Sequence, residues 1–170
     1  RPSLRLGVFV LTSDDPEFTD YWTSWGYSMD GRVSFRVGDK SFISLDIEDV
    51  ECEEKSTYVG DGLYSETRSH ILSAQLLYKR RLRKEAKLMP YGGIGFGISR
   101  LRGTYKSRYA NAVAFFSKDI IEYDFSYRSF VGLDVGQNFI LEVGYMYGGR
   151  NGNTGISVLI GVETAGIEGL

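Results

Sequence analysis

A strict two-residue alternation between apolar and polar side chains constrains this chain more than any other feature of its sequence. From residue 27 to residue 37, the odd positions are apolar or glycine and the even positions are polar or charged. The same period returns in residues 43–48 and 141–145. Because successive side chains of a strand point to opposite sides, each segment predicts a strand with one apolar face and one charged face.

Eight such strands are predicted, and the connections between them alternate in length. The turns at 38–40 and 136–138 and the basic segment at 80–87 are short, whereas the connections at 12–24, 52–69, 102–119 and 148–154 are long. Short turns at one end and long loops at the other are typical of outer-membrane barrels. Residues 1–170 are therefore expected to form one all-β domain, an eight-stranded antiparallel up-and-down transmembrane β-barrel with strands at about 4–12, 25–37, 41–51, 70–80, 88–101, 121–135, 139–148 and 155–163.

The composition excludes several classes of protein. The 20 Lys and Arg residues against 22 Asp and Glu residues give a net charge of −2, so there is no basic field for nucleic acid. A run of about 18 apolar residues, as a membrane-spanning helix needs, is missing from the sequence. One cysteine, Cys52, and one histidine, His70, supply too few ligands to predict a metal, and we expect no cofactor. The first residues do not resemble a signal peptide, so an exported chain would be in its mature form.

Periodicity alone does not tell which face of the barrel points outward. The apolar face carries about two dozen large side chains, and an eight-stranded interior holds few. In strand 88–101, Gly93, Gly95 and Gly97 lie opposite the apolar positions, and glycine suits a crowded interior better than an outer surface. Both observations favour apolar side chains outside. The opposite arrangement would make a soluble lipocalin-like carrier of a small apolar ligand, and it stays open here.

With the apolar face outside, charged residues fill the lumen and aromatic residues gather where the long loops begin. A three-residue turn at 38–40 sets Arg32 opposite Asp46 and Asp30 opposite Glu48, so we expect ion pairs to plug the lumen. The expected lumen cluster is Asp30, Arg32, Arg36, Asp46, Glu48, Arg128 and Glu142. The expected aromatic girdle at the membrane interface is Trp25, Tyr27, Tyr123, Tyr127, Tyr145 and Tyr147.

Two motifs in residues 88–163 resemble a known family. The strand Met89-Pro90-Tyr91-Gly92-Gly93-Ile94-Gly95-Phe96-Gly97 resembles the "PYxGxGxG" strand of OmpA-like and OmpX-like outer-membrane β-barrels. Residues 132–135 and 140–147 resemble that family's "GxxY…LxLGYRY" hairpin. The resemblance implies an eight-stranded barrel in a bacterial outer membrane and says little about activity.

The expected role is structural, anchoring or recognition of a partner through the long loops, without catalysis. The lipids of the outer membrane, including lipopolysaccharide, are the expected surroundings, and a protein partner would meet loops 12–24, 52–69 and 102–119. The candidate recognition residues are Arg102, Tyr105, Lys106, Arg108 and Tyr109, since arginine suits phosphate and tyrosine suits sugar or protein. A narrow pore and a lipid-A-modifying hydrolase are weaker alternatives. For the hydrolase, His70 and Ser73 would lie on opposite faces of one strand.

Overall fold

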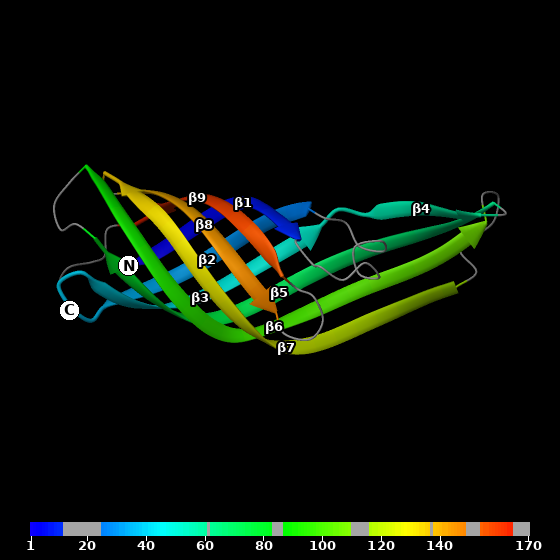
Figure 1. Ribbon diagram of the computed structural model, residues 1–170, viewed down its shortest axis with the longest axis horizontal. Coiled ribbons are helices and arrows are strands. Elements are labelled where there is room, and N and C mark those ends of the chain that lie inside the picture. The colour runs from blue at the N-terminus through cyan, green and yellow to red at the C-terminus, as the bar shows by residue number, and fades with distance from the viewer. Residues whose placement is uncertain are drawn as a thin grey trace.

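Nine β-strands build the structure, a computed structural model that describes residues 1–11, 25–60, 62–82, 87–109, 116–136, 138–148 and 154–164. Eight of these strands form a barrel, and the remaining strand, β4, lies beyond it (Figure 1). Among the described residues, no helix is long and apolar enough to cross a membrane. The strands are β1 (Pro2–Leu11), β2 (Trp25–Arg36), β3 (Ser41–Cys52), β4 (Lys55–Gly60), β5 (Leu63–Arg81), β6 (Leu88–Tyr109), β7 (Phe116–Val135), β8 (Phe139–Gly148) and β9 (Gly155–Glu163).

The barrel closes through two pairings that join distant parts of the chain. Each strand pairs antiparallel with its neighbour, β1 pairs with β9, and β3 pairs with β5. The pairings put Arg32 opposite Asp46 and Asp30 opposite Glu48, which confirms the register predicted from the turn at 38–40. The predicted eight-stranded antiparallel up-and-down barrel is therefore confirmed.

The apolar face of the barrel points outward. Arg5 and Arg128 inside the barrel have no exposed surface, while Tyr27 and Val131 on the outside are 60% and 64% exposed. A lipocalin-like interior is therefore wrong for this chain, because its apolar side chains surround the barrel rather than a ligand. The outward side chains of the barrel wall form an apolar belt that includes Leu4, Leu6, Val8, Met29, Val33, Leu45, Ile47, Leu76, Ile94, Phe96, Ile98, Phe125, Val131, Leu141, Val143, Val158 and Ile160.

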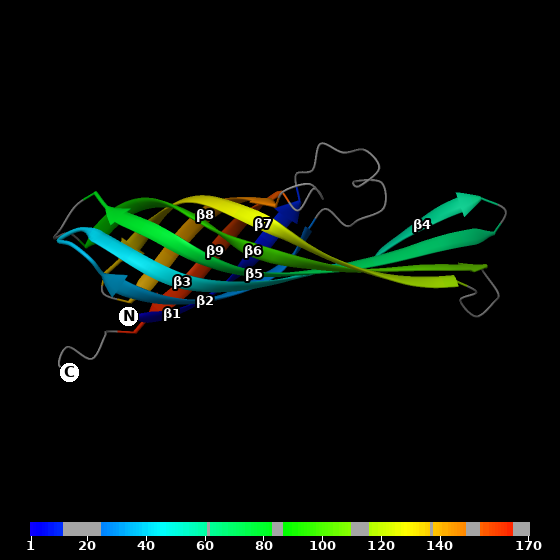
Figure 2. The ribbon, with the colours of Figure 1, turned by 90° about the horizontal axis from the view of Figure 1, so that it is seen from below.

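A sheet of strands projects from one end of the barrel, where long loops were expected. The beginning of β5, the end of β6 and the beginning of β7 continue past the barrel, and β4 pairs with β5 beside them (Figure 2). The N-terminus lies at the other end of the barrel (Figure 1). The expected loops 52–69 and 102–119 are thus largely strands, and the expected loop 12–24 lies outside the described residues. We call β4 with residues 63–70 of β5, 102–109 of β6 and 116–122 of β7 the projecting sheet.

The projecting sheet escaped prediction because its sequence has no apolar face. Ser65, Thr67 and Ser69 face one side of β5, while Glu66 and Arg68 face the other. Both faces are polar, so the alternation that marks a half-buried strand disappears although the backbone ladder continues. Only the pairing with neighbouring strands identifies these residues as strand.

Glycines on the inner face of β6 make room for side chains of neighbouring strands, as expected. A Cβ atom added to Gly93 would meet the Phe130 ring, and one added to Gly95 would meet the Leu77 side chain. Phe130 and Leu77 belong to a buried apolar cluster that also contains Tyr91 and Ile140. The glycines therefore let large side chains fill the end of the lumen that lies away from the projecting sheet.

Candidate functional site

Seven charged side chains from five strands meet in the middle of the lumen. They alternate with outward apolar residues, so the strand period itself turns them inward. All are at least 96% buried. This central charge cluster consists of Arg5 (β1), Asp30 and Arg32 (β2), Asp46 and Glu48 (β3), Arg128 (β7) and Glu142 (β8).

Arginines bridge the carboxylates of the central charge cluster. The Nη1 of Arg128 donates to Glu48 Oε2 at 2.6 Å and to Asp46 Oδ2 at 3.2 Å. The Nε of Arg32 donates to Asp46 Oδ1 at 2.7 Å. The two Nη atoms of Arg32 donate to the two oxygens of Glu142 at 2.9 and 3.0 Å, a bidentate contact. A buried charge needs such partners, and here each cation contacts at least two acids.

Arg5 belongs to the central charge cluster, although it was not among the predicted lumen residues. It donates to Asp30 and, at 2.7 Å, to Asp46 Oδ1. The signal was present in the sequence, because Leu4, Leu6 and Val8 alternate with Arg5 and so assign it to the inner face. Tyr91 is a second addition, and its hydroxyl donates to Glu142 Oε2 at 2.9 Å.

Arg36 does not join the central charge cluster, contrary to expectation. It lies at the end of β2, where its side chain is 65% exposed and contacts the backbone oxygens of Gly38 and Asp39. The even spacing from Arg32 is correct, but β1 pairs with β2 only as far as Val33, so Arg36 has a neighbouring strand on the β3 side alone. In its place, Lys79 and Arg81 close this end of the lumen by pairing with Asp134 at 2.9 and 2.7 Å.

Apolar side chains close the lumen above the central charge cluster. Phe9, Val50 and Ile71 are almost completely buried there. They belong to a cluster of buried residues, Phe9, Val50, Cys52, Ile71, Leu101 and Met146. A polar path for ions would have to cross this layer, so the interior has the architecture of a plug and does not support a pore.

The six expected girdle residues all point outward and are exposed. Tyr127 and Tyr147 are direct neighbours on β7 and β8, and Trp25 contacts Tyr27 edge to face at 5.5 Å between ring centroids. Tyr123 lies four residues farther along β7 than Tyr127. Tyr145 is 41% exposed on β8. Their role at a membrane interface stays a prediction.

The expected recognition residues are part of strand β6 and do not share one surface. Arg102 and Lys106 lie on the outward face of the projecting sheet. Tyr105 lies on the opposite face and contacts Phe116. The side chains of Arg108 and Tyr109 lie outside the described part of the structure. These residues therefore lie on a strand and not on a loop, and their role in recognition stays a prediction.

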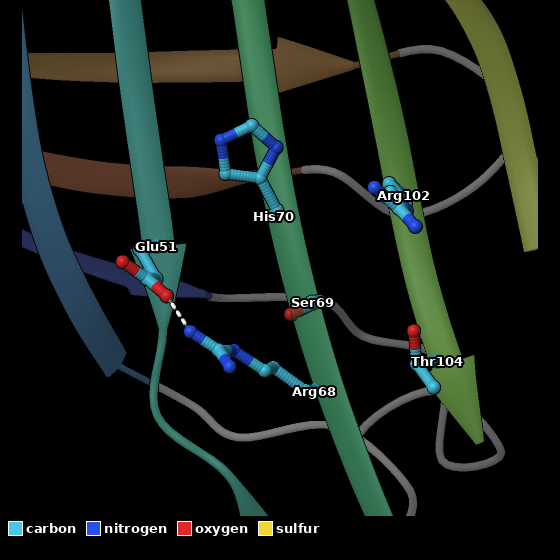
Figure 3. A pocket seen from close by; sticks show the side chains of 6 residues that line it. All are labelled: Glu51, Arg68, Ser69, His70, Arg102 and Thr104. Atoms are coloured by element: carbon cyan, nitrogen blue, oxygen red, sulfur yellow. Dashed lines mark hydrogen bonds and ion pairs between the residues drawn. The ribbon is translucent and has the colours of Figure 1, made fainter. Parts of the chain in front are cut away.

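A hollow of about 440 Å³ opens on the outward side where the projecting sheet leaves the barrel. Figure 3 shows the side chains that line it, with Arg68 paired to Glu51 across the β5–β3 boundary. His70 in the hollow pairs with Asp49, whereas Ser73 is 99% buried inside the barrel. His70 and Ser73 therefore do not form a Ser–His pair for hydrolysis. Among the described residues, no group of three or more His, Cys, Asp or Glu could hold a metal.

Comparison with solved structures places the fold among eight-stranded outer-membrane β-barrels of the OmpA-like and OmpX-like kind. The attachment invasion locus protein Ail of Yersinia pestis has a TM-score of 0.56 at 10% identity, covering 95% of both chains. Neisserial surface protein A has a TM-score of 0.57 at 13% identity, covering 95% of this chain and 94% of that one. The N-terminal barrel domain of Pseudomonas aeruginosa OprF has a TM-score of 0.51 at 13% identity, covering 94% and 96%.

The resemblance to these proteins is one of structure rather than sequence. A scan against protein-family models finds no match, and a search of curated protein sequences finds none either. The likeness therefore defines the class of fold, and function has to be argued from the surfaces of this chain.

Proposed function

We propose that this chain is an integral outer-membrane barrel with a closed lumen that holds a sheet outside the cell for recognition. The apolar belt carries this proposal. A predominantly apolar surface around a barrel with a charged interior is stable in lipid and costly in water. The ends where β2 meets β3 and β7 meets β8 lie at the end of the barrel away from the projecting sheet (Figure 1). In outer-membrane barrels, short periplasmic turns likewise lie opposite the longer extracellular loops.

Gel mobility with and without boiling tests the membrane part of the proposal. A folded membrane barrel extracted in detergent resists SDS and migrates differently after boiling. We expect the protein in the membrane fraction with this shift. Recovery in the soluble fraction without a shift would contradict the proposal.

Cysteine labelling on intact cells tests which end is outside. The native Cys52 is 99% buried, so it contributes little background to labelling with a membrane-impermeant maleimide. Tyr58→Cys puts a thiol on exposed β4, and Arg36→Cys puts one at the opposite end. We expect Tyr58→Cys to react on intact cells and Arg36→Cys to react only after the outer membrane is permeabilised. The reverse result would invert the orientation.

The open edge of β7 favours an extended protein segment as the recognised partner. β8 pairs with β7 only from Ser126 onward, so among the described residues no strand covers the outer edge of residues 116–125. An uncovered edge offers backbone donors and acceptors to an added strand. The structure of Ail is known in complex with the heparin analogue sucrose octasulfate. This soluble polyanion offers a second probe for the present chain.

Two neighbouring proline variants separate edge pairing from folding. Successive N–H groups of a strand point to opposite sides. Of the two variants Ile120→Pro and Ile121→Pro, one therefore removes an N–H that pairs with β6, and the other removes an N–H at the open edge of β7. Peptides selected from a displayed library on the barrel in nanodiscs would be the probe. We expect the variant that removes only the open-edge N–H to lose binding of these peptides while keeping its heat-modified band. Undiminished peptide binding by both variants would contradict edge recognition, and binding of sucrose octasulfate alone would favour polyanions.

A further inference from the structure

Outward-facing basic side chains, three arginines and a histidine, gather on two neighbouring strands at the limit of the apolar belt nearest the projecting sheet. Arg68 and His70 lie on β5, and Arg100 and Arg102 lie on β6, with His70 directly opposite Arg102. Among the described residues at the same end of the barrel, the outward positions of the other strands are uncharged or acidic. Examples are Val10 on β1, Tyr27 on β2, Glu51 on β3, Tyr147 on β8 and Ile156 on β9.

The strand register places this cation group at one sharp boundary. Ile47, Ala74, Ile98 and Phe125 form one outward row across β3, β5, β6 and β7. The next outward row on β6 begins with Arg100, about 7 Å farther along the strand. Arg100 therefore stands where hydrocarbon gives way to headgroups, if the belt spans the hydrocarbon.

Two of the cations have bonding capacity left. Arg68 and His70 are engaged by Glu51 and Asp49. Among the described residues, the buried Nε of Arg100 has no hydrogen-bond partner, and Arg102 is held only by Asp119, at 4.0 Å. Arginine binds phosphate oxygens with two parallel hydrogen bonds, which is the contact that these two side chains lack.

The hollow beside these arginines opens on the lipid-facing side of the wall. Its lining includes Arg68, His70 and Arg102, and Figure 3 shows Arg102 on β6 across from His70 on β5. Tyr123 lies opposite Arg100 on β7 and is 72% exposed, an amphipathic side chain suited to the headgroup level. Ile98 and Phe125 lie outside the lining of this hollow, in the outward row next to Arg100 on the side of the apolar belt, so a ligand of Arg100 would have these two apolar side chains below its headgroup.

Resting on the proposed membrane location, we propose that Arg100 and Arg102 bind the phosphate monoester headgroup of one membrane lipid whose acyl chain lies along Ile98 and Phe125. A lipid supplies both halves of this surface, whereas free phosphate would use only the arginines. The site would fix one phosphorylated lipid at the flank of the barrel from which the projecting sheet rises.

Native mass spectrometry in phosphatidylcholine nanodiscs containing a small fraction of phosphatidic acid tests the site. We expect the wild-type barrel to retain phosphatidic acid selectively, and Arg100→Gln with Arg102→Gln to weaken this retention at least about tenfold. Lys118→Gln removes an exposed cation of the projecting sheet on β7 and should retain the lipid like wild type. The double lysine variant should fall between, because it keeps charge without the bidentate contact.

Three results would overturn the site: equal retention by wild type and the double glutamine variant, an equal loss with Lys118→Gln, or complete displacement by millimolar inorganic phosphate. The last would identify free phosphate as the ligand. Each variant is first shown to keep its heat-modified band, so these results concern the headgroup site alone. Failure of the wild-type protein to reach the membrane fraction would instead overturn the proposed function.

Discussion

At the scale of single residues, the interior of this barrel depends on mutual compensation of buried charges. Three arginines face four carboxylates with almost no access to water. Removing one member of such a group leaves its partners buried and unpaired, which is far costlier than losing an exposed pair. The central charge cluster is therefore where single substitutions should change stability most.

Arg128→Met is expected to lower the free energy of unfolding by about 3–5 kcal/mol, because it strips hydrogen bonds from Glu48 and Glu142 at once. Urea unfolding in lipid vesicles, followed by tryptophan fluorescence, measures the loss. Arg36→Met is the matched control, since its ion pair with Asp39 is exposed and should contribute less than about 1 kcal/mol. Equal losses in the two variants would contradict a stabilising role for the cluster.

Gly93→Ala is expected to destabilise the barrel by about 1–3 kcal/mol, because the added methyl group collides with the Phe130 ring. Gly31→Ala, which meets nothing within 4 Å, should be nearly neutral in the same unfolding experiment. Combining Gly93→Ala with Phe130→Leu should cost less than the sum of the two single changes, since the smaller side chain relieves the collision with the ring, although the contact with the Tyr78 backbone oxygen remains. Strict additivity would show that the two positions do not compete for space.

At the scale of strands, the projecting sheet combines fully paired and half-paired members. β6 has a partner on each side over residues 103–107, whereas β7 at residues 116–125 pairs only with β6 among the described strands. Polar faces on both sides leave backbone pairing as the main source of order there.

Amide hydrogen exchange of the barrel in detergent micelles should reveal this difference. We expect continuous protection over residues 103–107 of β6. In residues 116–125 of β7, every second amide should exchange quickly, because alternate N–H groups point to the open edge. Uniform protection of β7 would mean that its edge is covered, and uniformly fast exchange in both strands would mean that the projecting sheet does not persist in solution.

At the scale of the whole molecule, the layered lumen makes the barrel a closed body. The Lys79–Asp134 pair, the central charge cluster and the apolar layer around Phe9 and Ile71 follow one another along the axis. In planar lipid bilayers we expect no stepwise ion conductance from the purified barrel. Steady single-channel steps, absent from protein-free controls, would show that these layers open.

The alternation in the sequence determined the barrel and the side chains that face inward, and the length of the turn at 38–40 determined the register between β2 and β3. It did so because lipid outside and a packed lumen inside make opposite demands on successive residues. The strands Phe139–Gly148 and Gly155–Glu163 even begin and end where the sequence predicts. The burial of Arg5 was readable in the same way, from its apolar neighbours Leu4 and Leu6.

Only the tertiary structure decided what happens where this contrast ends. Above the apolar belt both faces of β5 and β6 are polar, so residues that resemble loops continue as strands held by their neighbours' backbones. The exposure of Arg36 depends on where the barrel stops, and the meeting of Arg100, Arg102 and His70 depends on pairing between strands. The two-residue alternation assigns each side chain to the inner or the outer face of the barrel. Its position along the barrel axis and its neighbours on other strands follow from how the strands pair.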